Sequence, residues 1–499
     1  MATQPDDLAP LERGALNTLA EQLAQWFAAR IHARALATGA RLPSVRDAAR
    51  RHGLAPSTVV AAYDLLQAQG LVEARAQRGF FVRGHDTPAL PRRAAPARRD
   101  PPLDAAALVR SMFEHQGERA LSPGIGTLPA DWLDLSLLHS ALRRAMAEDA
   151  RDPQSLRYGD PAGDARLRMA LTQRLAHLGI GADAGQVVTT AGATAALDIA
   201  SHLLLAPGDS VLVDEPGWPV EFARLAQMGV KCVPIPRVAD GPDRDAMRRA
   251  LESRRGADKP RCYITVSVLH NPTGGSITLA AAHEVLKLAE AHDLTIVEDD
   301  TYAWLASPQA PRLATLDQLQ RTVYISGFSK ILAPGWRVGF LAASPALAER
   351  AIRRKLLTTL AAPGLEERAL AITLEQGVPR RHAERMAQRL AAARTRTVRL
   401  AQDAGFSFAT PPQGLFGWLE CGVDTDRLAT LLHGQGWLLA PGSLFHALPK
   451  PSTRMRINFA ATQEARLWRA LREARERLLS RPGASPPAET GAAADRISA

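Results

Sequence analysis

The sequence predicts an α/β protein that joins a small winged helix-turn-helix unit to a larger unit built on a mostly parallel sheet. Three observations lead to this prediction. Helical patterns followed by two short strand patterns occupy residues from about 16 to 84, apolar runs alternate with helical patterns from about 185 to 343, and a Pro- and Arg-rich stretch lies between these regions. With 499 residues and 46% apolar content, the chain is long enough to form more than one core.

The first element is a pair of short helices. Ser44 followed by Asp47 is typical of a helix N-terminus, and Gly53 is placed where a helix ends. A second helix is expected from about Pro56 to Gly70. A small helical bundle would show the same pattern, so the helices alone do not decide between a bundle and a helix-turn-helix that enters the major groove.

The following residues favour the helix-turn-helix, because 70–75 and 78–82 read as two strands of a hairpin. Residues 16–83 together resemble the winged helix of GntR-type regulators. The resemblance implies double-stranded DNA as a partner, and it implies contacts from the arginine after Pro-Ser, from the start of the second helix and from the wing tip. These positions are occupied here by Arg46, Ser57, Thr58, Arg78 and Gly79. Hydroxyls and an arginine fork suit phosphates and base edges.

The domain boundaries follow from composition. Residues 1–84 are assigned to the winged helix-turn-helix and 85–117 to a linker, since 85–103 contain five prolines and four arginines, a composition that resists a packed core. The large unit is assigned to 118–480. Residues 481–499 are predicted to be a disordered tail.

Bulk properties narrow the class of protein. The net charge of +10 is compatible with nucleic-acid binding without proving it. No apolar run approaches the length of a bilayer span, and the first residues lack a signal-peptide pattern, so we expect a soluble, cytoplasmic protein with no membrane partner. Cys232, Cys262 and Cys421 are isolated in sequence, and we therefore assign neither a metal nor a disulfide.

The large unit should contain a sheet covered on both faces, with ligands at the carboxyl ends of its strands. The predicted strands are 187–190, 211–214, 232–235, 262–267, 295–298, 323–326 and 338–342. Residues 346–478 are richer in helix and read as a second, smaller domain.

Several strand ends carry what pyridoxal phosphate requires. Lysine occurs at only six positions, and Lys330 follows a strand, which makes it the candidate for the covalent bond to the cofactor. Arg337 is the candidate bidentate phosphate ligand. Gly192, Ala193 and Thr194 lie between a strand and a helix, where backbone amides can hold an anion.

Other strand ends offer partners for the cofactor ring. Asp299 is expected to hold the pyridine nitrogen, with Asp300 as the alternative. Asn271 and Tyr302 can donate to the phenolic oxygen, and Trp218 can stack on the ring face.

The motifs of the large unit, in this order, resemble the fold-type-I aminotransferases over residues 118–475. They are Tyr158-Gly-Asp-Pro-Ala-Gly163, Ala191-Gly-Ala-Thr194, Pro216-Gly-Trp218, Asn271-Pro-Thr-Gly274, Asp299-Asp-Thr-Tyr302, Ser329-Lys330 and Arg337. The resemblance implies that Arg456 binds a substrate carboxylate, with Arg454 as its competitor, and that a neighbouring subunit contributes Tyr158 near the phosphate. Relatives usually carry Ser or Thr where Gly327 stands, which leaves Ser326 or Ser329 to supply that hydroxyl.

The whole chain resembles the MocR group of GntR-type regulators. This resemblance implies a homodimeric transcription factor that holds pyridoxal phosphate and senses an amine, an amino acid or the cofactor itself. The alternative is an active aminotransferase with an appended DNA-binding domain. A metabolic enzyme with no DNA-binding role would not explain why residues 16–83 carry the pattern of a winged helix.

Overall fold

The structure, a computed structural model, describes residues 11–83 and 122–480, except for 13, 15–16, 34, 76–77, 154–155 and 449. The chain divides into two compact units, Met1–Asp100 and Pro101–Ala499. The linker expected at 85–117 and the tail expected at 481–499 lie outside the described residues. Each unit is described by itself.

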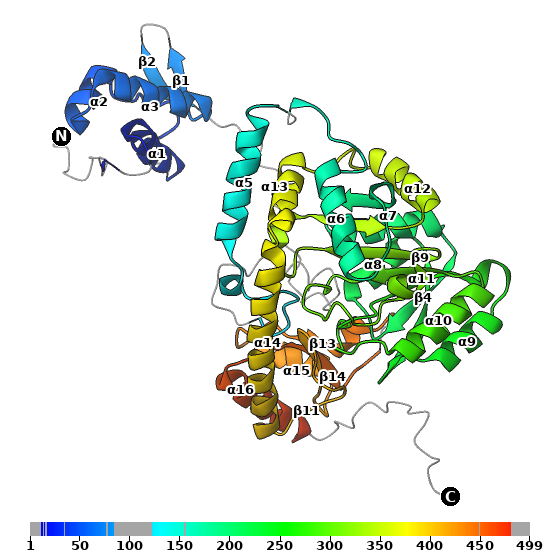
Figure 1. The fold of residues 1–499 in the computed structure, drawn as a ribbon. Helices are drawn as coiled ribbons and strands as arrows, with labels where there is room; N and C mark the ends of the chain where they lie inside the picture. Colours follow the sequence, from blue (N-terminus) through cyan, green and yellow to red (C-terminus); the bar gives the residue numbers. More distant parts are fainter. Residues whose placement is uncertain are drawn as a thin grey trace, which may run out of the picture. The chain divides into compact units, whose positions relative to one another are not determined.

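The first unit is the predicted winged helix-turn-helix. Its elements are α1 (Leu19–His32), α2 (Val45–His52), α3 (Pro56–Ala68), β1 (Val72–Arg75) and β2 (Gly79–Val82), with β1 and β2 paired antiparallel (Figure 1). The Ser44 hydroxyl accepts a hydrogen bond from the amide of Asp47 at 3.2 Å, and Gly53 ends α2 with φ of 64°. The helical caps expected from the sequence are therefore present.

A small apolar core holds this unit together. Leu23 and Phe27 of α1 pack against Tyr63 and Leu66 of α3, and all four side chains are buried. The Tyr63 hydroxyl donates to the carbonyl of Pro43 at 2.9 Å, which ties α3 to the turn before α2. The exposed ends of α2 and α3 are thus fixed relative to each other, as a DNA-reading surface requires.

The second unit is built on an eight-stranded sheet with the order β3-β10-β9-β8-β7-β4-β5-β6. Its strands are β3 (Val187–Thr190), β4 (Ser210–Glu215), β5 (Lys231–Val238), β6 (Gly241–Pro242), β7 (Pro260–Thr265), β8 (Thr295–Asp299), β9 (Thr322–Gly327) and β10 (Gly339–Ala342). The neighbours β5, β4, β7, β8 and β9 run parallel, which confirms the mostly parallel sheet. Strand β10 is antiparallel to both neighbours, since residues 328–338 provide no crossover helix.

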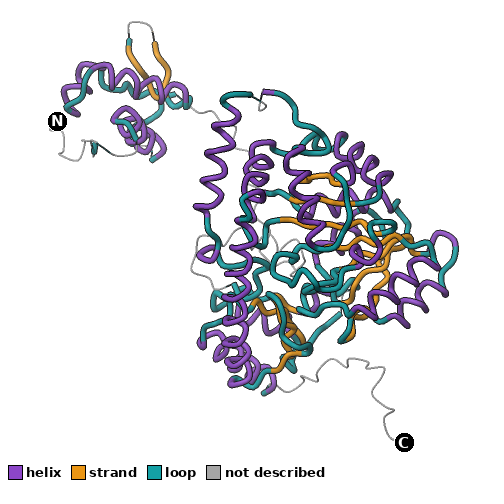
Figure 2. The backbone as a smooth tube through the Cα atoms, in the orientation of Figure 1, coloured by secondary structure: helices purple, strands orange, loops and turns teal. Residues whose placement is uncertain are grey.

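Helices cover both faces of this sheet (Figure 2). They are α6 (Ala165–His177), α7 (Ala193–Leu204), α8 (Pro219–Gln227), α9 (Arg244–Glu252), α10 (Leu279–Ala291), α11 (Leu313–Asp317), α12 (Pro345–Leu356) and α13 (Gly364–Glu375), and α5 (Leu135–Asp149) packs on α13. Consecutive strand residues enter opposite layers: Val187 joins the layer of α6 and α13, while Val188 joins the layer of α7 and α12. Because both layers are apolar, the strands read as uninterrupted apolar runs.

A second, four-stranded antiparallel sheet with the order β11-β12-β14-β13 follows. Its strands are β11 (Ser407–Phe408), β12 (Phe416–Glu420), β13 (Ala440–Pro441) and β14 (Arg454–Asn458), and the accompanying helices are α14 (Val378–Asp403), α15 (Thr425–His433) and α16 (Ala465–Leu479). Trp468 of α16 is buried in the core between these helices and the sheet. In the part of the chain that is described, no helix is long and apolar enough to cross a membrane.

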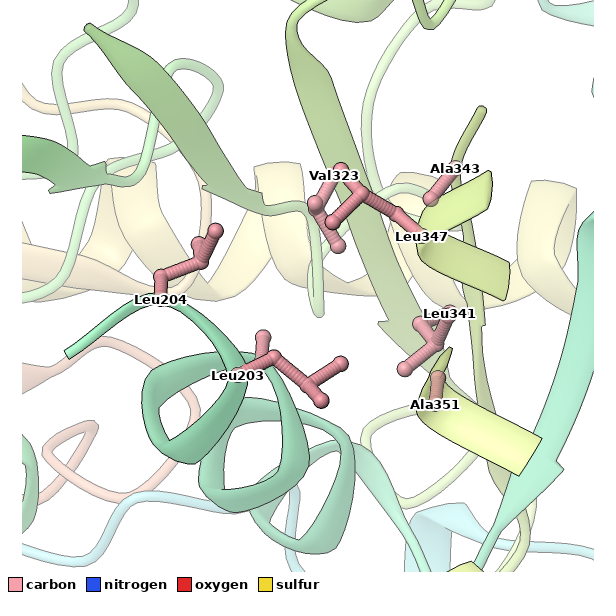
Figure 3. Close-up of a pocket in the computed structure, with 8 residues that line it drawn as sticks. Leu203, Leu204, Val323, Leu341, Ala343, Leu347 and Ala351 are labelled. Atoms are coloured by element: carbon pink, nitrogen blue, oxygen red, sulfur yellow. The ribbon is translucent and has the colours of Figure 1, made fainter. Parts of the chain in front are cut away.

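One small cavity lies between α7, α12 and the strands β9 and β10 (Figure 3). Leucine, valine and alanine side chains such as Leu203, Val323, Leu341 and Leu347 line it. With no polar side chain to orient a ligand, this cavity is a gap in helix-sheet packing and not a candidate functional site.

Candidate functional site

The candidate site forms at the carboxyl ends of five strands of the large sheet. Gly192 follows β3, Trp218 follows β4, Asn271 follows β7, Asp299 ends β8 and Lys330 follows β9. These five strands point the same way, because β3 and β9 are both antiparallel to the β10 strand between them. The topology therefore gathers residues that are up to 138 positions apart in sequence (from 192 to 330).

An anion site lies at the N-terminus of α7. Gly192 adopts φ of 83°, and a Cβ built on it would lie 2.6 Å from an Nη atom of Arg337. Arg337 also donates to the carbonyl of Ala191 at 3.2 Å. The guanidinium and the amides at the N-terminus of α7, where Ala193 and Thr194 form the first turn, thus face the same small space. Both are electropositive, and together they suit a phosphate.

The serine hydroxyls near this anion site differ in availability. Ser326 is buried and donates to the carbonyl of Asp300 at 2.8 Å, so its hydroxyl is already used. Ser329 is partly buried and has no hydrogen bond to another described residue. Of the two serines that were expected to replace the hydroxyl missing at Gly327, Ser329 is the one that remains available.

Lys330 lies among charged groups. Its Nζ donates to the carbonyl of Gly126 at 2.8 Å. Burial lowers the pKa of Lys330 to about 8, and the positive charges of Arg456 and Arg337 act in the same direction against the opposing effect of Asp299. A lysine with this pKa carries a substantial neutral fraction near neutral pH, which a nucleophilic amine requires.

The two neighbouring aspartates have different surroundings. Asp300 is fully buried, and its Oδ2 accepts from Nε of Arg312 at 2.5 Å and from the Tyr324 hydroxyl at 2.8 Å. Asp299 accepts only from the amide and hydroxyl of Thr301 among the described residues, and burial raises its pKa to about 6. Asp299 is therefore the carboxylate that faces Lys330, and Asp300 belongs to the core.

A cavity of about 30 Å³ is lined in part by Asp299. Trp218, His270 and Glu221 also line it. Within the described residues, His270 Nε2 and Glu221 Oε2 are buried without a hydrogen-bond partner. The volume and these polar atoms suit one bound water. Glu221 escaped the sequence prediction, although it lies only three residues after Trp218, which is the N-cap residue of α8.

Arg456 of β14 reaches the same region from the second sheet. It is buried, and it donates to Asn271 Oδ1 at 2.9 Å and to the carbonyl of Gly124 at 2.6 Å. Its guanidinium stacks over the rings of Phe416 and Phe445, 4.6 and 5.0 Å from their centroids. Because Asn271 uses its oxygen to accept from Arg456, its amide nitrogen remains a donor.

The remaining side chains of this region separate into two groups. Tyr302 is buried with its ring 5.6 Å from that of Phe416 and belongs to the site. Arg454, the competitor of Arg456, instead pairs with Glu420 at 3.0 Å. Tyr158 is 88% exposed and is not brought to the site of its own chain.

In the first unit, the residues expected to contact DNA lie on the surface. Arg46, Ser57, Arg78 and Gly79 are exposed, and Thr58 is partly exposed. Sequence reasoning missed Arg41, whose guanidinium lies 3.5 Å from the position of a Cβ on Gly79. Its place directly before Leu-Pro-Ser was the available signal.

The fold and the site define a protein that carries a winged helix and an aminotransferase-type domain. The chain matches the family of class I and II aminotransferases over residues 124–473 and the gntR family of bacterial regulatory proteins over residues 19–82. It is 31% identical to the HTH-type transcriptional regulator TauR of Rhodobacter capsulatus, covering 88% of this chain and 91% of TauR. It is also 30% identical to the probable rhizopine catabolism regulatory protein MocR of Rhizobium meliloti, over 75% of this chain and 76% of MocR.

The chain therefore belongs to the MocR-type transcriptional regulators, in which a GntR-type helix-turn-helix is fused to a class I and II aminotransferase domain. Solved aminotransferases share the fold of the second unit. The α-aminoadipate aminotransferase LysN of Thermus thermophilus matches with a TM-score of 0.67 and 24% identity, over 75% of this chain and 95% of LysN. The relatives that match over both units are named as regulators, which supports a regulator over an enzyme with an appended domain.

Proposed function

We propose that this transcriptional regulator binds pyridoxal phosphate through Lys330 and senses a small amine of the amino-acid class, or the cofactor itself. The observation that carries the proposal is the position of Lys330, whose pKa is influenced by Asp299, Arg337 and Arg456, in a chain that also contains a winged helix. The sensed molecule changes the affinity of the winged helix for DNA.

The residues present fit the cofactor. Arg337 and the N-terminus of α7 would hold its phosphate, Asp299 its pyridine nitrogen, Asn271 and Tyr302 its phenolic oxygen, and Trp218 a ring face. When bound, the cofactor supplies an aldehyde that forms covalent bonds with amines and a ring that withdraws electrons. LysN, which shares this fold, was solved with N-(5′-phosphopyridoxyl)-L-leucine.

The class of effector follows from Arg456. A buried guanidinium that presents its fork to the site is suited to a carboxylate. Its present hydrogen bonds, to an amide oxygen and a backbone carbonyl, leave its charge without an anionic partner among the described residues. In an effector with both an amine and a carboxylate, the amine would react with the cofactor held at Lys330 and the carboxylate would pair with Arg456.

We also propose that two copies of the chain form the working unit. Leu156, Tyr158 and Leu357 are 83%, 88% and 84% exposed, which is unusual for such side chains. A Cβ on Gly159 would lie 3.4 Å from the Cβ of Ala361, so the loop carrying Tyr158 lies beside the loop after α12. A second copy would bury these exposed side chains and bring its own Tyr158 toward the anion site.

The pKa of Lys330 predicts how cofactor attachment depends on pH. The rate at which cofactor-free protein captures pyridoxal phosphate should rise with pH through a midpoint of about 8, because only the neutral amine attacks. Arg456→Met removes a positive charge and should move the midpoint upward. Asp299→Asn removes a negative charge and should move it downward. Stopped-flow absorbance at a series of pH values measures each midpoint, and shifts in the same direction would contradict the assignment.

The DNA-binding half is tested with DNA flanking the regulator's own gene. Binding should weaken steeply with salt, because contacts to phosphates release counterions. Arg46→Ala should weaken it by roughly 5- to 150-fold, about 1–3 kcal/mol, and should leave cofactor absorbance unchanged. Arg353→Ala makes the same charge change on α12 in the other unit and should have little effect. Footprinting that finds no protected site, together with measurable transamination, would instead favour the enzyme.

A further inference from the structure

Residues 122–127, which we name the strap, lie across the two side chains that the effector is proposed to engage. The carbonyl of Gly124 accepts from Arg456 at 2.6 Å, and the carbonyl of Gly126 accepts from Lys330 at 2.8 Å. Backbone oxygen atoms of the strap thus accept hydrogen bonds from Arg456 and Lys330, the two side chains that would bind the effector's carboxylate and the cofactor. No signal of this role was read from the Pro-Gly-Ile-Gly sequence.

The strap is fastened to the second sheet beside Arg456. The side-chain amide of Asn458 donates to the carbonyls of Ile125 and Thr127 at 2.9 and 2.8 Å. The backbone amide of Asn458 donates to the carbonyl of Pro123 at 3.1 Å, and the amide of Gly124 donates to the carbonyl of Leu438 at 3.0 Å. Asn458 lies two residues after Arg456 on β14, so both side chains point to the same face.

We propose that the strap competes with the effector for Arg456. When the carboxylate of the effector binds Arg456, the hydrogen bond from Arg456 to Gly124 is lost and the strap is released. This inference rests on the proposed function. A carboxylate makes stronger, charge-assisted bonds to a guanidinium than a neutral carbonyl does, so it displaces Gly124 when it arrives. The other bonds that hold the strap, from the Asn458 side chain and from the backbone, are neutral hydrogen bonds that are each weak, which makes displacement reversible.

The place of the strap in the sequence gives its displacement a consequence. It is the first described part of the second unit after the winged helix, which ends near Arg83. Because the strap is the described segment of the second unit that lies nearest in sequence to the winged helix, its release is the change that we propose to alter DNA affinity. The effector shifts the strap, and with it DNA affinity, by no more than the difference between its own binding free energies to the released and the fastened strap.

Two glycines of the strap provide a matched pair of variants. A Cβ at Gly124 would lie 2.6 Å from the backbone nitrogen of Ala440 and 2.7 Å from the carbonyl carbon of Leu439, so Gly124→Ala should force the strap away. A Cβ at Gly126 meets only the Arg456 guanidinium, at 3.7 Å or more, so Gly126→Ala should leave it fastened. Neither glycine has a positive φ, and alanine strains neither backbone.

The experiment uses the full-length protein and two probes that differ by a carboxylate-bearing group. Pyridoxamine 5′-phosphate lacks the carboxylate that N-(5′-phosphopyridoxyl)glycine carries. Hydrogen-deuterium exchange of residues 122–127 should accelerate in wild type with the glycine conjugate and not with pyridoxamine phosphate. Affinity for the flanking DNA should differ by 5- to 150-fold between the protein with the glycine conjugate and the protein with pyridoxamine phosphate.

The variants then separate the possible outcomes. Gly124→Ala should show fast exchange and the conjugate-bound DNA affinity with pyridoxamine phosphate alone, and it should bind the conjugate more tightly than wild type does. Gly126→Ala, which adds the same methyl group without a clash with the second sheet, should keep the slow exchange of wild type with pyridoxamine phosphate. A strap that stays protected while DNA affinity responds to the conjugate would overturn the strap and leave the proposed function standing. A strap that is released while DNA affinity stays constant would instead overturn the coupling to DNA.

Discussion

Lys330→Ala is expected to abolish covalent attachment of pyridoxal phosphate. Borohydride reduction of wild type should fix the cofactor on the peptide that contains Lys330, and the variant should yield no reduced peptide. The reason is positional, because Lys330 has a depressed pKa beside Asp299 and Arg337, the groups that would hold the ring and the phosphate. Since those groups remain in Lys330→Ala, the cofactor should still bind reversibly and be lost on dialysis.

Lys355 provides the control, because it is also buried and its pKa is also lowered by burial. Its Nζ lies 3.5 Å from the hydroxyl of Thr189, and the charge of Glu367 acts on it, so Lys355 belongs to the buried contacts between the end of α12 and β3. Lys355→Arg keeps that charge and should retain full labelling. Reduced cofactor recovered on Lys355, or on no lysine, would refute the proposed site.

Much of the sheet could be predicted from the sequence. Each expected strand is present, because burial on both faces leaves an uninterrupted apolar run that marks its position. The direction of a strand leaves no such mark, and the antiparallel β10 became evident only from its pairing with β3 and β9. Strand β6 has two residues, Gly241 and Pro242, which is too short for a periodic pattern.

The sequence predicts a site residue where a motif places that residue at the end of a strand. It predicts less where contacts with residues distant in sequence determine which of two candidates has the role. Asp299 and Asp300 are adjacent, and only the position of Arg312 shows which one the core uses. Arg454 and Arg456 share one face of β14, and the ion pair of Arg454 with Glu420 leaves Arg456 as the arginine of the site. The contact of Arg456 with Gly124 spans 332 residues, a separation at which sequence spacing carries no information.

The largest expected effect on stability comes from Arg312→Met. Arg312 and Asp300 are both fully buried, and Arg312 also donates to the carbonyls of Pro308 and Ala310 at 3.2 and 2.9 Å. Its removal leaves a buried carboxylate with the Tyr324 hydroxyl as its remaining side-chain donor among the described residues. Breaking a buried pair from one side typically costs about 3–5 kcal/mol, and we expect a loss of that size in the free energy of unfolding.

Arg380→Met is the matched comparison, because Arg380 pairs with Glu384 at 3.2 Å while both side chains are more than 60% exposed. Its expected cost is about 0–1 kcal/mol, since water solvates either charge once the pair is lost. Urea denaturation followed by circular dichroism compares the two. Adding Asp300→Asn to Arg312→Met should recover part of the loss, because a neutral amide can still accept from Tyr324 without a buried charge. Equal losses in Arg312→Met and Arg380→Met would show that Arg312 does not neutralise Asp300, and the assignment of Asp299 rather than Asp300 to the cofactor would lose its main support.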